Sequence, residues 1–337
     1  MPLPAKKQKT KGSIIFLTTG GLQPDTLLNV LGQDFHVHSY LLKTHSAFFA
    51  KFLDSKDKES MSDKARGSSS FRYEWISMAD DDKKGWHLIA KPDSFSENSD
   101  SLYKAYKGDA EFEQKAFGSV LCAIYGQAYT FSSCLALKTL TSLADYYQCL
   151  PILSRTITDG LLNSPRMFLG LYEDACDMMM LATKIRNKFL FTEALICIAG
   201  NLELHSNVEI GNIPICKIRK IVLNVQNAVM AKVVRMQQLL AEAANDLYEE
   251  DDERDRLSLS MSNTISASFP AYFRAVLADG PWISDNHKID LDLEDILSSN
   301  LRFDLRMRAG NGIWENTLLC ARIDDDDLPW DVTETVW

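Results

Sequence analysis

The chain lacks the features of several common protein classes. It has no apolar run near the roughly 18 residues that a membrane-spanning helix requires, and its first apolar cluster, residues 13–17, is too short for the core of a signal peptide. It also lacks the G-x-S-x-G, G-x-x-x-x-G-K-[ST], G-x-G-x-x-G and H-E-x-x-H motifs. We therefore expect an intracellular protein, in the cytoplasm, the nucleus or both, with no catalytic residues and no cofactor. An enzyme whose site is assembled only in three dimensions is the alternative.

Closely spaced cysteines are also absent. The seven cysteines are far apart and include no C-x-x-C pair, whereas zinc sites and small disulfide scaffolds need closely spaced or densely packed cysteines. Most lie on apolar faces of predicted helices, where a thiol packs as a small hydrophobic group. His36, His38 and His45 have no carboxylate or thiol cluster at ligand spacing. We predict reduced, mostly buried cysteines, no metal site, and a structural, hydrogen-bonded role for His38.

The composition is that of a globular chain with an acidic balance. Its 337 residues are 46% hydrophobic and 24% charged, enough for about two domains with real cores. Lys and Arg number 36 and Asp and Glu 46, which gives a net charge of −10. This balance disfavours nucleic-acid binding over the whole surface, so we expect protein partners.

Short strands and polar insertions are predicted in the first third of the chain. Residues 1–12 form a flexible basic tail, whose four lysines could instead be a nuclear-localisation patch. Two polar stretches, near residues 54–70 and 91–109, are predicted insertions. A hairpin turn at Gly32-Gln33 joins two of the strands. Strand-like patterns cover residues 13–18, 26–31, 34–37, 73–78 and 86–90.

Helical periodicity dominates the remainder. Ser46 is a predicted N-cap, Ser132 or Ser133 is another, and Pro151 occupies a first turn. Asn163-Ser164-Pro165 marks the predicted domain boundary. The long helix has an apolar stripe that fits a domain core or a coiled-coil seam, and its width favours the core. Helices are predicted over residues 39–43, 46–53, three segments between 112 and 161, 176–185, 188–199, 215–248, 271–277 and 293–297.

Residues 25–49, DTLLNVLGQDFHVHSYLLKTHSAFF, resemble the opening of a BTB/POZ domain. Residues 117–129 and 143–150 resemble later helices of the same family. The resemblance implies an α+β BTB/POZ domain over residues 13–165, a small sheet covered by helices. Residues 166–337 then resemble the helical C-terminal region of the BTB proteins of filamentous fungi. The motif positions are Asp25, Phe35, Val37, His38, Leu42, Ser46, Phe48 and Phe49.

The resemblance implies a non-catalytic interaction scaffold or adaptor, with the chain itself (a homodimer) or a cullin-type ubiquitin ligase as partner. A nuclear regulator that recruits a corepressor is the alternative. An exchanged N-terminal strand could stabilise a dimer. Two departures from the family's sequence pattern affect these expected partners. Ser39 stands where dimeric members often have a basic residue, so Asp25 would be solvated, capped by backbone N–H groups, or set in a rebuilt pocket. Asp57-Lys58-Glu59 replaces the family's hydrophobic-x-Glu motif. The candidate interaction residues are Asp25, His38, Ser39, Phe49, Phe52, Leu53 and Glu59.

Two acidic runs, at residues 249–253 and 324–327, have two interpretations. Such runs are usually solvated faces or tails. The second run is followed by Leu328 and Trp330, with Trp337 nearby, so it could instead be a docking peptide with aromatic anchors.

Overall fold

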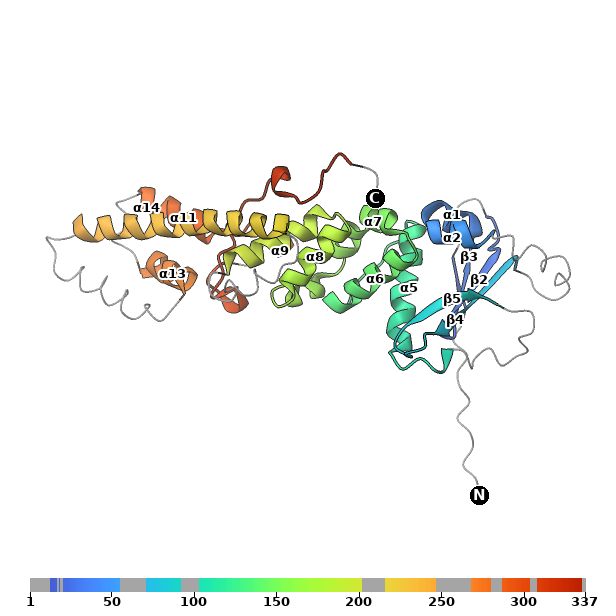
Figure 1. Ribbon diagram of the computed structural model, residues 1–337. Helices are drawn as coiled ribbons and strands as arrows, with labels where there is room; N and C mark the ends of the chain where they lie inside the picture. Colours follow the sequence, from blue (N-terminus) through green and yellow to red (C-terminus); the bar gives the residue numbers. More distant parts are fainter. Residues whose placement is uncertain are drawn as a thin grey trace, which may run out of the picture. The chain divides into compact units, whose positions relative to one another are not determined.

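The chain divides into two compact units, Met1–Asn163 (unit 1) and Ser164–Trp337 (unit 2). The computed structural model (Figure 1) describes residues 13–16, 18, 21–54, 71–91, 103–201, 216–246, 268–279, 287–303 and 308–334. The predicted basic tail, Glu59, the acidic run at 249–253 and most of both polar insertions lie outside these residues. The fold class is mixed α+β, as predicted. No helix in the described part is both long and apolar enough to cross a membrane.

Unit 1 contains a five-stranded mixed sheet with the strand order β1-β3-β2-β4-β5. β2 pairs antiparallel with β3 and parallel with β4, and β1 pairs parallel with β3. All five predicted strands are confirmed, although the first is only two residues long. The strands are β1 (Ile14–Ile15), β2 (Thr26–Val30), β3 (Gln33–Val37), β4 (Tyr73–Ala79) and β5 (Trp86–Ala90).

The turn of the β2–β3 hairpin is centred on Leu31-Gly32, one residue earlier than predicted. Both residues have positive φ, 48° at Leu31 and 90° at Gly32, as expected of a tight hairpin turn. A leucine in this conformation is strained, and side chains from elsewhere hold it. The Ser77 hydroxyl accepts from the Leu31 N–H at 2.7 Å, and the Gln114 amide donates to the Leu31 carbonyl at 2.8 Å. Gln33 pairs with Val30 inside the sheet, which moves the turn back by one position.

Five helices accompany the sheet among the described residues of unit 1. Two predicted N-caps are confirmed, because the Ser46 and Ser133 hydroxyls accept from the N–H groups of Phe49 and Ala136. Asp109 caps a third helix in the same way. The helices are α1 (Ser39–His45), α2 (Ala47–Phe52), α5 (Ala110–Ile124), α6 (Cys134–Tyr146) and α7 (Leu150–Leu162), and α5 packs on both α6 and α7.

An aromatic core joins the sheet of unit 1 to its helices. Phe49 and Tyr147 stack with their ring centroids 5.6 Å apart and an interplanar angle of 3°. The Phe117 ring packs edge-on against Phe35 at 5.8 Å and against Tyr147 at 5.5 Å. All four side chains are buried, and aromatic pairs in these arrangements stabilise a core beyond the area that they bury.

Unit 2 is mainly helical in its described residues up to Leu297 and mostly irregular after it. α9 is buried from Glu193 to Gly200, because α8 packs on it from one side and α11 also contacts it. Its apolar residues follow no single face, as expected of a helix inside a core. The helices are η2 (Pro165–Gly170), α8 (Ala175–Lys184), α9 (Lys188–Gly200), α11 (Cys216–Asp246), α13 (Phe269–Asp279), α14 (His287–Leu297), η3 (Gly312–Trp314) and η4 (Asp325–Asp327).

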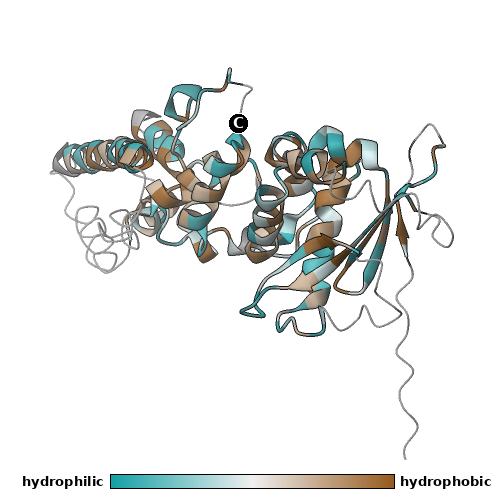
Figure 2. Cartoon of the chain, turned by 45° about the vertical axis from the view of Figure 1, so that its right-hand side comes forward, coloured by the Kyte–Doolittle hydropathy of each residue, from teal (hydrophilic) through white to brown (hydrophobic). Residues whose placement is uncertain are grey.

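The long predicted helix is α11, and its apolar stripe faces the core of unit 2. The helix packs against α9 and α14, and hydrophobic and hydrophilic residues alternate along it (Figure 2). The interpretation as core is therefore confirmed for the described part of the stripe, which excludes Leu247. The buried stripe residues are Ile218, Val222, Val225, Val229, Val233, Met236 and Leu240.

Candidate functional site

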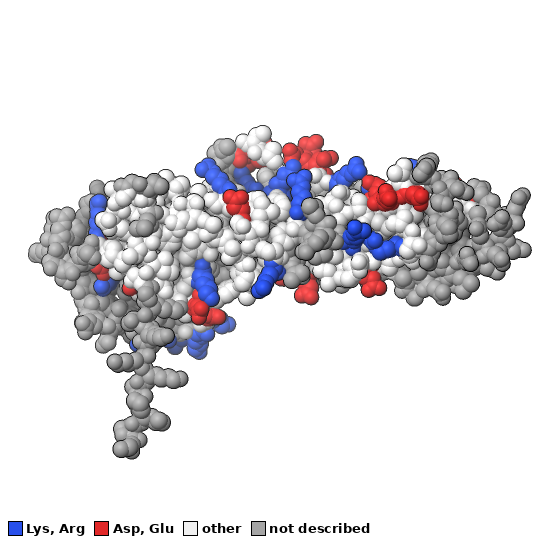
Figure 3. Space-filling view, turned by 180° about the vertical axis from the view of Figure 1, so that it is seen from behind, with Lys and Arg blue, Asp and Glu red and all other residues white. Residues whose placement is uncertain are grey.

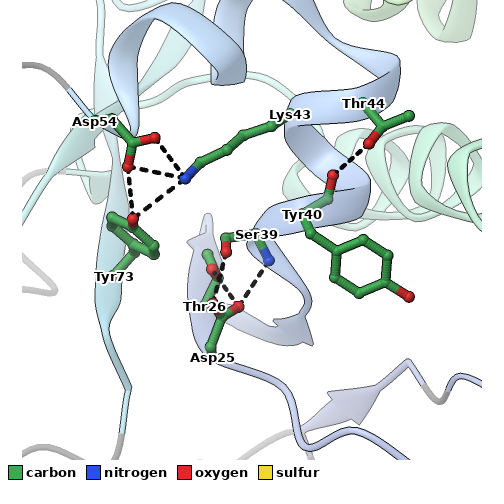
Figure 4. Close-up of polar contacts among 8 residues, drawn as sticks. All are labelled: Asp25, Thr26, Ser39, Tyr40, Lys43, Thr44, Asp54 and Tyr73. Atoms are coloured by element: carbon green, nitrogen blue, oxygen red, sulfur yellow. Dashed lines mark hydrogen bonds and ion pairs between the residues drawn. The ribbon is translucent and has the colours of Figure 1, made fainter. Parts of the chain in front are cut away.

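The Asp25 carboxylate lies at the start of β2 and binds the first residue of α1 (Figure 4). It accepts from the Ser39 N–H at 2.7 Å, the Ser39 hydroxyl at 2.6 Å and the Thr26 hydroxyl at 3.1 Å. Burial raises the pKa of Asp25, but the hydrogen bonds from Ser39 and Thr26 outweigh it and hold the pKa below its ordinary value. The ionised carboxylate thus satisfies a backbone donor that the start of the helix would otherwise leave unpaired.

Asp25 has hydrogen-bond partners although position 39 holds a serine rather than a basic residue. Of the arrangements considered, capping by a backbone N–H is the one observed, and the Ser39 hydroxyl adds a second donor. Hydrogen bonds to the charged form stabilise a carboxylate without a neighbouring cation. An ionised Asp25 thus needs no basic residue at position 39.

His38 links three parts of unit 1. Its Nε2 lies 2.9 Å from the Leu22 carbonyl, and its Nδ1 lies 2.8 Å from the Tyr125 hydroxyl. Its backbone N–H donates to the same hydroxyl at 2.7 Å. A neutral imidazole with its proton on Nε2 satisfies every partner, because Tyr125 then donates to Nδ1 and accepts from the backbone. The predicted structural role of His38 is confirmed.

A polar network that the sequence did not indicate connects α1, the end of α2 and β4 (Figure 4). The Lys43 Nζ lies 2.7 and 2.8 Å from the two Asp54 oxygens and 3.3 Å from the Tyr73 hydroxyl. Tyr73 also donates to Asp54 at 2.7 Å. The hydrogen bond from Lys43 is the largest cause of a lowered pKa at Asp54. These residues are far apart in sequence and match no motif, so only the fold reveals them.

Phe48, Phe52 and Tyr146 form an aromatic patch on the surface of unit 1. The Phe48 ring centroid lies 4.9 Å from that of Phe52 and 5.9 Å from that of Tyr146. Phe52 is 38% exposed and Tyr146 is 52% exposed. The Lys51 ammonium lies 5.4 Å from the centroid of the Phe52 ring. Contiguous exposed aromatic side chains of this kind are typical of protein–protein contact surfaces.

The structure separates the predicted interaction residues into interior and surface. Phe49 and Leu53 are core residues, 1% and 3% exposed, and cannot meet a partner in the folded chain. Asp25, His38 and Ser39 are occupied by the internal hydrogen bonds described above. Of the predicted set, Phe52 is on the surface and Glu59 lies outside the described residues. Tyr146 was missed because the sequence does not show that it lies beside Phe48, which belongs to a distant helix.

Exposed apolar residues also mark the edge strand β1. Ile14 and Ile15 are 45% and 54% exposed. The next residue, Phe16, is buried, donates its N–H to the His36 carbonyl at 3.0 Å and packs on the Tyr125 ring at 4.7 Å. The strand is thus paired with β3 and held by Phe16, and it leaves two large apolar side chains exposed at a sheet edge, where natural proteins usually avoid them.

The described residues contain no group of three or more His, Cys, Asp or Glu side chains that could hold a metal ion. His36 instead packs edge-on against the Phe71 ring at 4.8 Å. All seven cysteines are free thiols. Basic and acidic side chains are interspersed over the face shown in Figure 3.

No protein-family model, no curated protein and no solved structure matches this chain. The function is therefore argued from the chain's own residues: the Asp25–Ser39 contact, the aromatic patch and the edge strand β1.

Proposed function

We propose that the chain is a non-catalytic interaction scaffold or adaptor, and that unit 1 is a BTB/POZ domain. The positions of the motif residues support this assignment. Asp25 precedes β2, His38 follows β3, and Leu42, Ser46 and Phe49 are buried in or between α1 and α2. The hairpin, two short helices, further strands and three longer helices follow in the order that the resemblance implies.

The proposal for function is based on the aromatic patch. It is a contiguous aromatic surface in which Phe48 packs on the buried Phe49 and Tyr147 rings, while Phe52 and Tyr146 are exposed. Aromatic residues at protein interfaces supply most of the binding free energy when a partner buries them. A protein partner that buries Phe52 and Tyr146 would remove their exposed apolar surface from water.

The leading partner is a subunit of a cullin-type ubiquitin ligase, and the test is affinity purification of the full chain under gentle lysis. Phe52→Asp puts a charge into the aromatic patch and leaves the core intact. Leu135→Asp is the matched control, because Leu135 is 61% exposed at the opposite end of the helix that carries Tyr146. Leu53 is unsuitable for this test because it is buried.

We expect cullin subunits with the wild-type chain and with Leu135→Asp, and at least tenfold less with Phe52→Asp. Equal recovery with Phe52→Asp would show that the aromatic patch is not the contact. Absence of cullin from the wild-type purification would contradict the adaptor function.

The edge strand β1 supports a second contact, between two copies of the chain. Pairing across a dimer would cover Ile14 and Ile15 and protect the sheet edge. We expect light scattering to report a dimer for the full chain and a monomer for Ile15→Lys, with Leu135→Lys as the control that stays dimeric. A wild-type monomer at high micromolar concentration would contradict the dimer.

A further inference from the structure

The C-terminal residues 322–334, here called the strap, form an acidic segment on the surface of unit 2. The segment is dark red in Figure 1. Just before it, the chain is firmly fixed, since Leu318, Leu319, Cys320 and Ala321 are buried and the Leu318 N–H donates to the Gly200 carbonyl at 3.0 Å. After Arg322 the strap has no basic residue. Its acidic residues are Asp324, Asp325, Asp326, Asp327, Asp331 and Glu334.

The strap lies against a surface that has three cationic side chains. We call these side chains, together with the Phe191 ring, the basic surface. Lys188, at the start of α9, forms an ion pair with Asp325. Arg186, in the turn between α8 and α9, lies 3.3 Å from a Glu334 carboxylate oxygen. Lys217, at the start of α11, donates to the Pro329 carbonyl at 3.0 Å. Two ion pairs and one hydrogen bond to the backbone thus join the strap to these cations.

Two hydrophobic side chains anchor the strap between its charged ends. Leu328 is 3% exposed. Trp330 packs edge-on against the buried Phe191 ring, with the centroids 5.5 Å apart and an angle of 81°. A short peptide with an aliphatic and an aromatic anchor and flanking charges is a common mode of peptide recognition.

The strap has local structure of its own. Asp324 and Asp327 form a reciprocal capping box around η4. The Asp331 carboxylate accepts from both the N–H and the hydroxyl of Thr333. The ion pairs that join the strap to the basic surface are open to solvent, where such pairs add little. The strap is thus an ordered peptide that is held mainly by two anchors. A peptide bound in this way can be displaced by a competing ligand.

We propose that the basic surface is a recognition site for an acidic peptide of a partner protein, with an aliphatic residue two positions before an aromatic one. The strap occupies the site in cis and competes with that peptide. Attachment through a short chain gives the strap a high effective concentration, so the partner binds well only when the strap is released. Because every contact lies in unit 2, this inference holds or fails independently of the function proposed for unit 1.

The test uses the full chain and a fluorescently labelled peptide with the sequence of residues 322–334, RIDDDDLPWDVTE. The double variant Leu328→Ala/Trp330→Ala removes both anchors of the strap without changing its charge. We expect it to bind the peptide at least tenfold more tightly than the wild-type chain in fluorescence anisotropy. Adding Lys188→Glu should weaken that binding at least fivefold, whereas Lys84→Glu, the same charge change in the exposed β4–β5 turn of unit 1, should not.

A peptide with both anchors replaced by alanine should bind at least tenfold more weakly; equal binding would mean that charge alone attracts it and would overturn the proposal. Equal, weak binding of the peptide by the wild-type chain and the double variant would also overturn it. If the double variant loses its circular dichroism signal, the single variant Trp330→Ala, which removes only the anchor that packs on Phe191, replaces it and the same comparison applies. A strap-dependent dimer of the wild-type chain would assign the basic surface to a second copy and overturn the partner assignment.

Discussion

Tyr125 is the residue through which His38 is held at the end of β3. Its hydroxyl accepts the His38 N–H and donates to the imidazole Nδ1, and the His38 side chain is buried. Tyr125→Phe keeps the ring that packs on Phe16 and removes only the oxygen. Two polar atoms then lose their partner, and each such loss costs about 1–3 kcal/mol.

We therefore expect Tyr125→Phe to lower the free energy of unfolding of unit 1 by about 2 kcal/mol in urea denaturation. Tyr146→Phe is the control, because the Tyr146 side chain is half exposed and should lose little. A Tyr125→Phe chain as stable as the control would contradict the role of the hydroxyl.

Glu193 is a buried carboxylate within the apolar helix α9. Its two oxygens accept from the backbone N–H groups of Arg302 at 2.9 Å and Phe303 at 3.3 Å. Burial raises the pKa of Glu193 to about 7, and the two hydrogen bonds and the Arg302 charge only partly oppose this. The carboxylate thus holds the turn after α14 in place. Its burial also removes the charge from water, which is unfavourable for the ionised form.

The raised pKa predicts how stability varies with pH. Between the ordinary value of 4.5 and about 7, the folded chain keeps a proton on Glu193 that the unfolded chain releases. The free energy of unfolding should therefore fall over this range, by roughly 3 kcal/mol from this group, and change little above it. Glu193→Gln should remove this fall in urea titrations at pH 5, 6, 7 and 8, whereas Glu242→Gln on the exposed side of α11 should retain it. An unchanged pH dependence in Glu193→Gln would contradict the assignment.

At the scale of the element, α11 offers neighbouring valines with opposite environments. Val233 is fully buried and Val234 is 47% exposed. Val233→Ala removes two buried methyl groups and should lower the free energy of unfolding of unit 2 by about 2 kcal/mol. Val234→Ala should change it by less than about 0.5 kcal/mol. Equal losses in the two variants, measured by thermal or urea denaturation, would indicate that the stripe is not the only face of α11 that packs.

At the scale of the whole molecule, the reactivity of the cysteine thiols can be used to measure burial in both units. Cys134, Cys149, Cys197 and Cys320 are buried, Cys122 and Cys176 are half-buried, and Cys216 is exposed. Burial raises the pKa of Cys149 to about 12, which suppresses its reactive thiolate. We expect one thiol to react rapidly with a thiol reagent in the native chain and all seven to react in denaturant.

Cys216→Ser should abolish the rapid phase, and Cys122→Ser should preserve it. Rapid reaction of several native thiols would show that the cores of the units open more easily than their burial indicates.

The sequence by itself determined where the main elements lie. Period-two alternation and turn residues located the strands, and the spacing of valines on α11 located its buried face. Ser46 and Ser133 were predicted as caps because a side-chain oxygen at that position satisfies a helix N–H locally. Such signals are local, since they depend on residues within one or two turns of each other.

Only the tertiary structure decided which functional candidates are free to act. The sequence placed Phe49, Phe52 and Leu53 in one short helical segment, and the fold buries the first and last and exposes the second. It also brought Ser39 to Asp25 and the strap to the basic surface. The first contact joins residues that are 14 positions apart in the sequence, and the second joins residues that are 137 positions apart. No local pattern specifies which distant side chains will meet. The elements follow from short-range periodicity, whereas the surfaces follow from long-range packing.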